Sequence, residues 1–184
     1  MAINERQLIS VDEFEDFIAR PENNDRRFQL IHGEIVEKMP TREHGVISGN
    51  VVTEFNLFLR KHPLGLAAVE ARHRPAGDLH NDRMPDVSVV LGDKPVEREG
   101  AAEYMPDVVV EVQSPDDSWR EMIRRGVFYL DHGAKIVLLV YPAKKQVEVL
   151  MGDDKMLLNI GDVIDLTAAL PEFTIAVADV FRGV

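Results

Sequence analysis

The chain has 184 residues, of which 45% are hydrophobic and 29% charged, and its formal net charge is −11. This length predicts one domain over residues 1–184, large enough to bury roughly two thirds of its unfolded surface. The absence of cysteine excludes disulfide scaffolds, thiolate zinc sites and cysteine nucleophiles. The negative charge argues against non-specific binding to nucleic acid, because such binding needs a cationic surface. It does not exclude a local basic groove.

The sequence predicts neither a secretion signal nor a membrane-spanning segment. Residues 1–6 lack the basic and apolar pattern of a secretion signal, and no apolar run approaches the roughly 20 residues that a membrane helix requires. We therefore expect a cytoplasmic protein with no membrane segment. The candidates for a basic groove are Arg72, Arg74, Arg120, Arg124 and Arg125.

The first half of the chain mixes helix and strand patterns. Apolar residues recur at helical spacing over 11–19, behind the capping residue Ser10. Residues 28–31 and 34–37 flank His32 and Gly33, which predicts a β-hairpin. Thr41 is expected to cap a helix that runs to about residue 62, with His44 on its inner face. A strand over 66–71 and a loop over 74–83 follow; in that loop we interpret the alternation of Asp78, His80 and Asp82 as solvated polar sequence.

The tetrapeptide Met-Pro-Asp-Val occurs at 84–87 and again at 105–108, and each copy introduces a predicted buried strand. Ser118 and Glu121 match a capping box that starts a helix. The residues expected to face inward from this helix are Trp119, Met122, Ile123, Val127 and Leu130. We interpret Trp119 as a core or capping residue rather than as a platform for base stacking. Strands over 136–141 and 146–150 complete an α/β fold, a mixed sheet flanked by helices.

Glu111 stands out because it is an acid inside a run of valines, and burial of a carboxylate is costly without a partner. Side chains alternate along a strand, so Glu111 and Gln113 share one face. If the strand after Asp86 is its neighbour, the two acids could converge on a metal ion. The alternatives are that Asp86 caps the turn after its proline, and that Glu111 forms an ion pair with Arg124 or Arg125.

Several motifs in chain order resemble the Uma-two family, restriction-endonuclease-like proteins of the PD-(D/E)XK nuclease superfamily. These motifs lie at residues 30–37, 41–45, 83–87, 106–115, 161–163 and 170–173. The resemblance implies a restriction-endonuclease-like core that hydrolyses DNA phosphodiester bonds with a divalent metal, and a homodimer. It implies Asp86 and Glu111 as the metal-binding acids, with Glu34 and His44 as accessory residues. The alternative is that neither residue has a role in the active site. Glu34 would then be a solvated strand residue and His44 a hydrogen-bonded residue of the first helical turn.

The family carries a lysine on the helix after the second acid, a few residues before a tyrosine. Here the tyrosine is Tyr129 and the matching position holds Arg125, while Gln113 stands where the broader superfamily places a strand lysine. Arginine stays protonated, so Arg125 is expected to offset charge but not to act as a base. Gln113 is expected to orient the attacking water. The alternative for Arg125 is a surface pair with Glu121, four residues earlier.

Mg²⁺ prefers oxygen ligands and keeps several waters, so Asp86, Glu111 and the carbonyl of Val112 would suffice to hold it, with Mn²⁺ as a substitute. The ion would activate water and offset charge on the phosphate. Arg125 in place of lysine and the charge of −11 keep a second hypothesis open: a catalytically inactive nuclease fold that serves as a binding or assembly module. A hydrolase of other phosphate esters is a third.

Overall fold

A computed structural model describes residues 8–184, which form two compact units. Unit 1 comprises residues 8–39, 72–84 and 97–104, and unit 2 comprises residues 40–71, 85–96 and 105–184. Each unit is described separately, and the single domain over 1–184 stays a prediction. No helix within residues 8–184 combines the length and the apolar character needed to cross a membrane.

Unit 1 is built on a helix and a hairpin, as predicted. Its elements are α1 (Val11–Ile18), the 3-10 helix η1 (Pro21–Asn23), β1 (Arg27–Ile31) and β2 (Glu34–Lys38). Ser10 caps α1, and Glu13 completes a capping box with it. The hairpin turn has φ values of 48° at His32 and 75° at Gly33. Positive φ at both central residues is the geometry of a two-residue turn that matches the twist of the strands.

Two arginines of unit 1 belong to a partly buried ion-pair network, so they do not form a basic groove. Asp82 Oδ2 lies 2.6 Å from Nη2 of Arg72 and 2.8 Å from Nη2 of Arg74. Glu15 Oε1 lies 2.8 Å from the same two nitrogens. Asp82 is fully buried, so the interpretation of its loop as solvated polar sequence was wrong at this position. The prediction of Arg72 and Arg74 as groove residues was wrong too, because carboxylates already neutralise them.

Unit 2 contains a six-stranded mixed sheet in the order β3-β4-β5-β6-β7-β8. The strands are β3 (Gly65–Val69), β4 (Val87–Leu91), β5 (Val108–Val112), β6 (Ile136–Tyr141), β7 (Gln146–Met151) and β8 (Asp154–Leu158). Only the β5–β6 pairing within this sheet is parallel. The other elements of the unit are α2 (Arg42–Lys61), α3 (Trp119–Asp131), the 3-10 helix η2 (Pro142–Lys144), β9 (Val163–Asp165), β10 (Thr174–Ala176) and α4 (Val177–Val180). The predicted α/β fold is confirmed.

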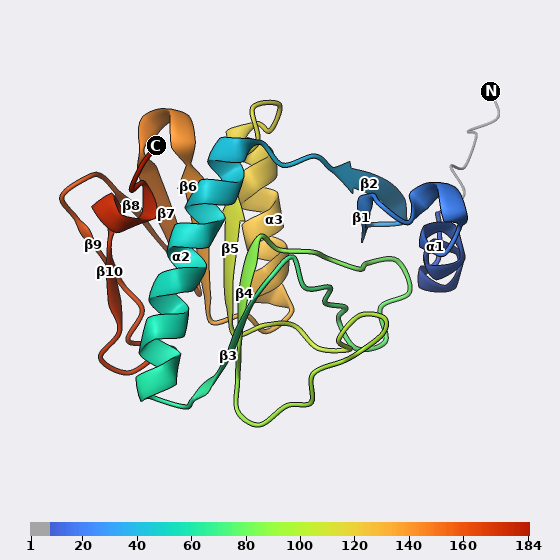
Figure 1. Ribbon diagram of the computed structural model, residues 1–184, viewed down its shortest axis with the longest axis horizontal. Coiled ribbons are helices and arrows are strands. Elements are labelled where there is room, and N and C mark those ends of the chain that lie inside the picture. The colour runs from blue at the N-terminus through green and yellow to red at the C-terminus, as the bar shows by residue number, and fades with distance from the viewer. Residues whose placement is uncertain (1–7) are drawn as a thin grey trace. The chain divides into compact units, whose positions relative to one another are not determined.

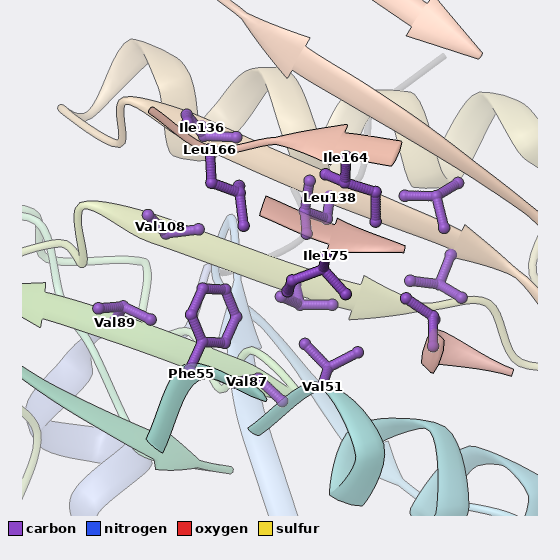
Figure 2. Close-up of a cluster of buried hydrophobic side chains, with 14 of the residues drawn as sticks. Val51, Phe55, Val87, Val89, Val108, Ile136, Leu138, Ile164, Leu166 and Ile175 are labelled. Carbon is purple, nitrogen blue, oxygen red and sulfur yellow. The ribbon is translucent and has the colours of Figure 1, made fainter. Parts of the chain in front are cut away.

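Helices cover both faces of this sheet, with α2 on one side and α3 on the other (Figure 1). On the α2 face, valines of β4 and β5 pack with Val51 and Phe55 of α2 and with residues of β9 and β10 (Figure 2). On the α3 face, Val109 of β5 packs in one cluster with Met122 and Tyr129 of α3. Because strand side chains alternate, Glu111 points to the same α3 face as Val109.

The buried face of α3 differs from the predicted one. Met122 and Tyr129 are buried, whereas Trp119 is 53% exposed and Val127 is 37% exposed. The buried line passes through Gly126, where an added Cβ would lie 2.5 Å from Cδ1 of Leu150. A glycine contributes nothing to an apolar pattern, so the pattern placed the inward face one residue away, at Val127.

Candidate active site

Asp86 directly precedes β4, and Glu111 lies on the neighbouring antiparallel strand β5. The β4–β5 ladder pairs Val87 with Val110 and Ser88 with Val109. Extending this ladder by one pair places Asp86, the residue just before β4, across from Glu111. Directly opposite residues on an antiparallel pair are nearest neighbours, with Cβ atoms about 5 Å apart. The backbone therefore meets the first requirement of the predicted two-acid site.

Asp86 is 2% exposed and both of its carboxylate oxygens contact protein groups. Oδ2 accepts a hydrogen bond of 2.7 Å from the backbone N–H of Val112. Oδ1 lies 2.9 Å from Nε2 of His44, in an orientation that does not form a hydrogen bond. The ring of His44 is buried and forms no hydrogen bond, so the alternative of a hydrogen-bonded first-turn residue was wrong.

The second copy of the tetrapeptide makes a hydrogen bond equivalent to the one that Asp86 accepts from Val112. Asp107 Oδ2 accepts a hydrogen bond of 2.8 Å from the backbone N–H of Leu91, at the far end of β4. Each aspartate therefore stands before one strand and binds the end of the other. The bond that Asp86 accepts comes from a residue 26 positions away, so it pairs two strands rather than closing a local turn. Asp107 differs in its second partner, because its Oδ1 lies 3.0 Å from Nζ of Lys135 at a partly exposed position.

Glu111 is 3% exposed, and its Oε1 accepts a hydrogen bond of 2.8 Å from the hydroxyl of Tyr129. A hydrogen bond from a neutral donor helps to stabilise a buried carboxylate. The alternative of an ion pair between Glu111 and Arg125 was wrong, because that guanidinium binds Asp117 instead. Arg124, the other alternative partner, is exposed.

Asp117, which the sequence did not suggest, holds two predicted site residues together. Its carboxylate accepts hydrogen bonds from Nη1 of Arg125 at 2.9 Å and from Nη2 of the same residue. It also accepts a bond of 3.0 Å from the backbone N–H of Ser114. Its carbonyl accepts a bond of 2.8 Å from Nε2 of Gln113. The alternative of a surface pair between Arg125 and Glu121 was wrong, because Glu121 caps its own helix.

The pairing with Asp117 also affects the protonation of Arg125. Burial alone would lower the pKa of this guanidinium, but the hydrogen bonds that it donates to Asp117 and the nearby charge of Glu111 raise the pKa above its ordinary value. Arg125 is therefore a permanent cation near Glu111. The sequence signal that could have revealed Asp117 is its spacing from Ser114, since the two residues close a turn in which the N–H of Asp117 bonds to the carbonyl of Ser114 at 3.0 Å.

A cavity of about 190 Å³ brings His44 and Gln113 together. It is lined by the start of α2, the exit of β5 and the exit of β6; the lining residues are Thr41, Glu43, His44, Gln113, Ser114, Pro115, Pro142 and Ala143. Glu34, the other predicted accessory residue, belongs to unit 1, where it begins β2 at an exposed position. Its accessory role stays a prediction.

The donor set can be compared with the needs of a divalent ion. Among residues 8–184 there is no group of three or more His, Asp or Glu side chains that could hold a metal ion. Mg²⁺ does not need such a cage, because it binds through one or two carboxylates and keeps several waters. Asp86, Glu111 and the Val112 carbonyl fit an ion of this kind, whereas zinc would require more protein ligands. The metal role of these residues stays a prediction.

The helix-flanked mixed sheet is that of a restriction-endonuclease-like fold. Residues 12–178 match the Uma2 family, which is described as "Putative restriction endonuclease", and the chain belongs to this family. A crystal structure from Anabaena variabilis, described as "a putative nuclease belonging to DUF820", is 25% identical and superposes with a TM-score of 0.77. The similarity covers 94% of this chain and 97% of that one. No curated protein matches the chain.

Proposed function

We propose that this protein is a metal-dependent endonuclease that hydrolyses DNA phosphodiester bonds. The site lies in unit 2, where β4 begins after Asp86 and β5 ends after Glu111. The observation that carries the proposal is the register that sets Asp86 opposite Glu111. Membership of the Uma2 family and the nuclease description of the similar structure support the same reaction class.

In this proposal Asp86 and Glu111 hold Mg²⁺ or Mn²⁺, with the Val112 carbonyl as a third oxygen. The ion would supply Lewis-acid polarisation of the phosphate and lower the pKa of a water. Tyr129 fixes the orientation of Glu111 through its hydroxyl, and the backbone N–H of Val112 fixes that of Asp86. His44 lies beside Asp86 and lines the cavity, where it can contact substrate.

Arg125 and Gln113 assist on the same side of the sheet. The guanidinium stays protonated, so it offsets negative charge on the phosphate and does not accept a proton. The amide nitrogen of Gln113 is held by Asp117, which leaves the amide oxygen to accept a hydrogen bond from water. Asp117 thereby positions both side chains.

A catalytically inactive binding or assembly module remains the second candidate. It is favoured by two contacts: Arg125 is already bound by Asp117, and each oxygen of Asp86 faces a protein group. The homodimer that the superfamily suggests is also a proposal. Light scattering of the purified protein would test it, and a monomer at assay concentration would exclude it.

Plasmid and oligonucleotide cleavage in Mg²⁺, Mn²⁺ or EDTA tests the activity. We expect metal-dependent cleavage by the wild type, reduced to the EDTA level in Asp86→Asn and Glu111→Gln. Asp107→Asn is the matched control, because it changes the equivalent aspartate of the same tetrapeptide and should retain activity. Calorimetric titration with Mg²⁺ should show binding that Asp86→Asn abolishes.

The inactive module predicts no cleavage by any variant. If Arg125→Lys then creates cleavage that the wild type lacks, the arginine at position 125, in place of lysine, accounts for the lost activity. Equal cleavage by the wild type and Asp86→Asn would show that the reaction occurs elsewhere or comes from a contaminant.

A further inference from the structure

Trp119 is the one tryptophan of the chain, and its ring is about half exposed in the first turn of α3. The expected core role was therefore wrong. A large aromatic side chain in contact with water invites a functional explanation when something holds it in place. In this protein a buried carboxylate does so.

Glu148 of β7 anchors the edge of the indole. Its Oε2 accepts a hydrogen bond of 3.1 Å from Nε1 of Trp119 and another of 2.8 Å from the hydroxyl of Tyr141. Glu148 is only 7% exposed and Tyr141 is buried. Burial and the Glu148 carboxylate raise the pKa of Tyr141 above its ordinary value, so the phenol stays a donor. The indole edge is thus fixed while much of the ring remains open, which reduces the entropy that a stacking contact would cost.

Two exposed arginines follow this ring in the sequence. Of the five arginines predicted for a basic groove, Arg72, Arg74 and Arg125 are bound by carboxylates. Arg120 and Arg124 are exposed and form no hydrogen bond or ion pair within residues 8–184. They lie four residues apart on α3, and therefore on one stripe of the helix, directly after Trp119.

This surface lies beside the candidate active site within unit 2. Extending the parallel pairing of Val112 with Val140 by one residue places Gln113 next to Tyr141, which shares Glu148 with Trp119. Trp119 also lies six residues before Arg125 on α3, a rise of about 9 Å along the helix.

We propose that Trp119 is a stacking platform for an unpaired base of the nucleic acid substrate, with Arg120 and Arg124 binding neighbouring phosphates and Glu148 as the positioning residue. The inference rests on the proposed function only in taking nucleic acid as the substrate. A base within a duplex is already stacked on both sides, so an exposed single ring fits a single-stranded, frayed or extruded base. Stacking also suits a chain with a net charge of −11, because it depends less on cationic surface.

The test measures binding by the full chain in EDTA, so that no cleavage intervenes. A short single-stranded oligothymidylate is titrated against the emission of Trp119, with a hairpin duplex for comparison. We expect saturable quenching by the single strand. Trp119→Ala should weaken binding of a labelled strand about 5- to 150-fold, measured by anisotropy. Trp119→Phe keeps a ring and should retain most of the affinity, and Val127→Ala, on the exposed side of the same helix, should leave it unchanged.

Glu148 is tested by two substitutions that separate positioning from packing. Glu148→Gln keeps an acceptor and should preserve the affinity, whereas Glu148→Leu releases the indole and should weaken binding and shift the emission of the free protein. Circular dichroism establishes that each variant is folded. Equal affinity of the Gln and Leu variants would remove Glu148 from the proposal.

The outcomes separate this inference from the proposed function. Strand binding without quenching, or unchanged in Trp119→Ala, overturns the stacking platform and leaves the nuclease proposal intact. Quenching by a protein that cleaves nothing in Mg²⁺ or Mn²⁺ supports the platform while the nuclease proposal fails. Absence of single-strand binding overturns the platform.

Discussion

Asp86 and Asp107 make equivalent hydrogen bonds from opposite ends of the β4–β5 strand pair. Each accepts from a backbone N–H at the end of the neighbouring strand, Val112 in one case and Leu91 in the other. The repeated Met-Pro-Asp-Val therefore helps to pair the two strands. In each copy the aspartate carboxylate adds one hydrogen bond to the neighbouring strand after the proline. Only the first copy places its aspartate opposite Glu111 and beside His44. The difference between the copies lies in their surroundings.

Truncation of either aspartate should destabilise the fold. Asp86→Ala removes the acceptor of the Val112 N–H, and a buried unsatisfied donor costs about 1–3 kcal/mol. Asp86→Asn keeps an oxygen there and should cost less. Asp107→Ala should cost less than Asp86→Ala, because its site is partly open to water. Urea unfolding of the variants gives the comparison, and equal stability of Asp86→Ala and wild type would contradict it.

Tyr129→Phe tests the hydroxyl that holds Glu111. Phenylalanine fills nearly the same volume, so the expected loss of about 1–2 kcal/mol reflects the hydrogen bond to a buried carboxylate. If Glu111 binds a metal ion, affinity for Mg²⁺ should also fall, because the carboxylate loses its orientation. Tyr141→Phe is the matched control, since it removes the same kind of bond from Glu148. It should lower stability but leave Mg²⁺ binding unchanged.

Gly126→Ala should destabilise unit 2 by about 1 kcal/mol or more, because the new methyl group would lie 2.5 Å from a core leucine, Leu150. Gly49→Ala is the opposite control. A Cβ at this position of α2 meets nothing within 4 Å, so better helix propensity should stabilise the protein by about 0.5–1 kcal/mol. Thermal melts of the two variants should therefore shift in opposite directions. A shift in the same direction would show that α3 does not pack closely at residue 126.

Glu15 should make unit 1 sensitive to acid. Burial alone would raise the pKa of this carboxyl, but hydrogen bonds and charge from Arg72 and Arg74 outweigh it and lower the pKa below its ordinary value of 4.5. The stabilisation is therefore complete above pH 4.5 and is lost as the pH falls through the lower, folded-state pKa. We expect the difference in unfolding free energy between wild type and Glu15→Gln to be constant near neutral pH and to shrink under acid. A difference that grows on acidification would reverse the sign of the linkage.

Local patterns identified most of the elements of this fold. The caps at Ser10, Thr41 and Ser118 all bind the backbone N–H groups that their spacing predicted. The hairpin at Gly33 and the strands around Glu111 are also where the sequence placed them. These predictions succeeded because each depends on residues within one or two turns of each other.

Predictions that depended on partners were less successful. Arg72 and Arg74 were expected at a surface groove, yet the carboxylates of Glu15 and Asp82 bind and neutralise them. Arg125 was weighed against Glu121 and Glu111 as ionic partners, and neither binds it. Charge type is visible in a sequence, but the identity of the nearest opposite charge depends on the folded chain.

By itself, the sequence determined the caps, the turns, the alternation that isolates Glu111 among valines, and the resemblance that led to the Uma2 family. Only the tertiary structure decided that Asp86 stands opposite Glu111, that Tyr129 donates to Glu111, and that Trp119 faces water while Glu148 holds its indole. The physical reason is range. Helix and turn preferences are short-range properties of the backbone, whereas strand register and the burial of charge depend on segments that folding alone brings together.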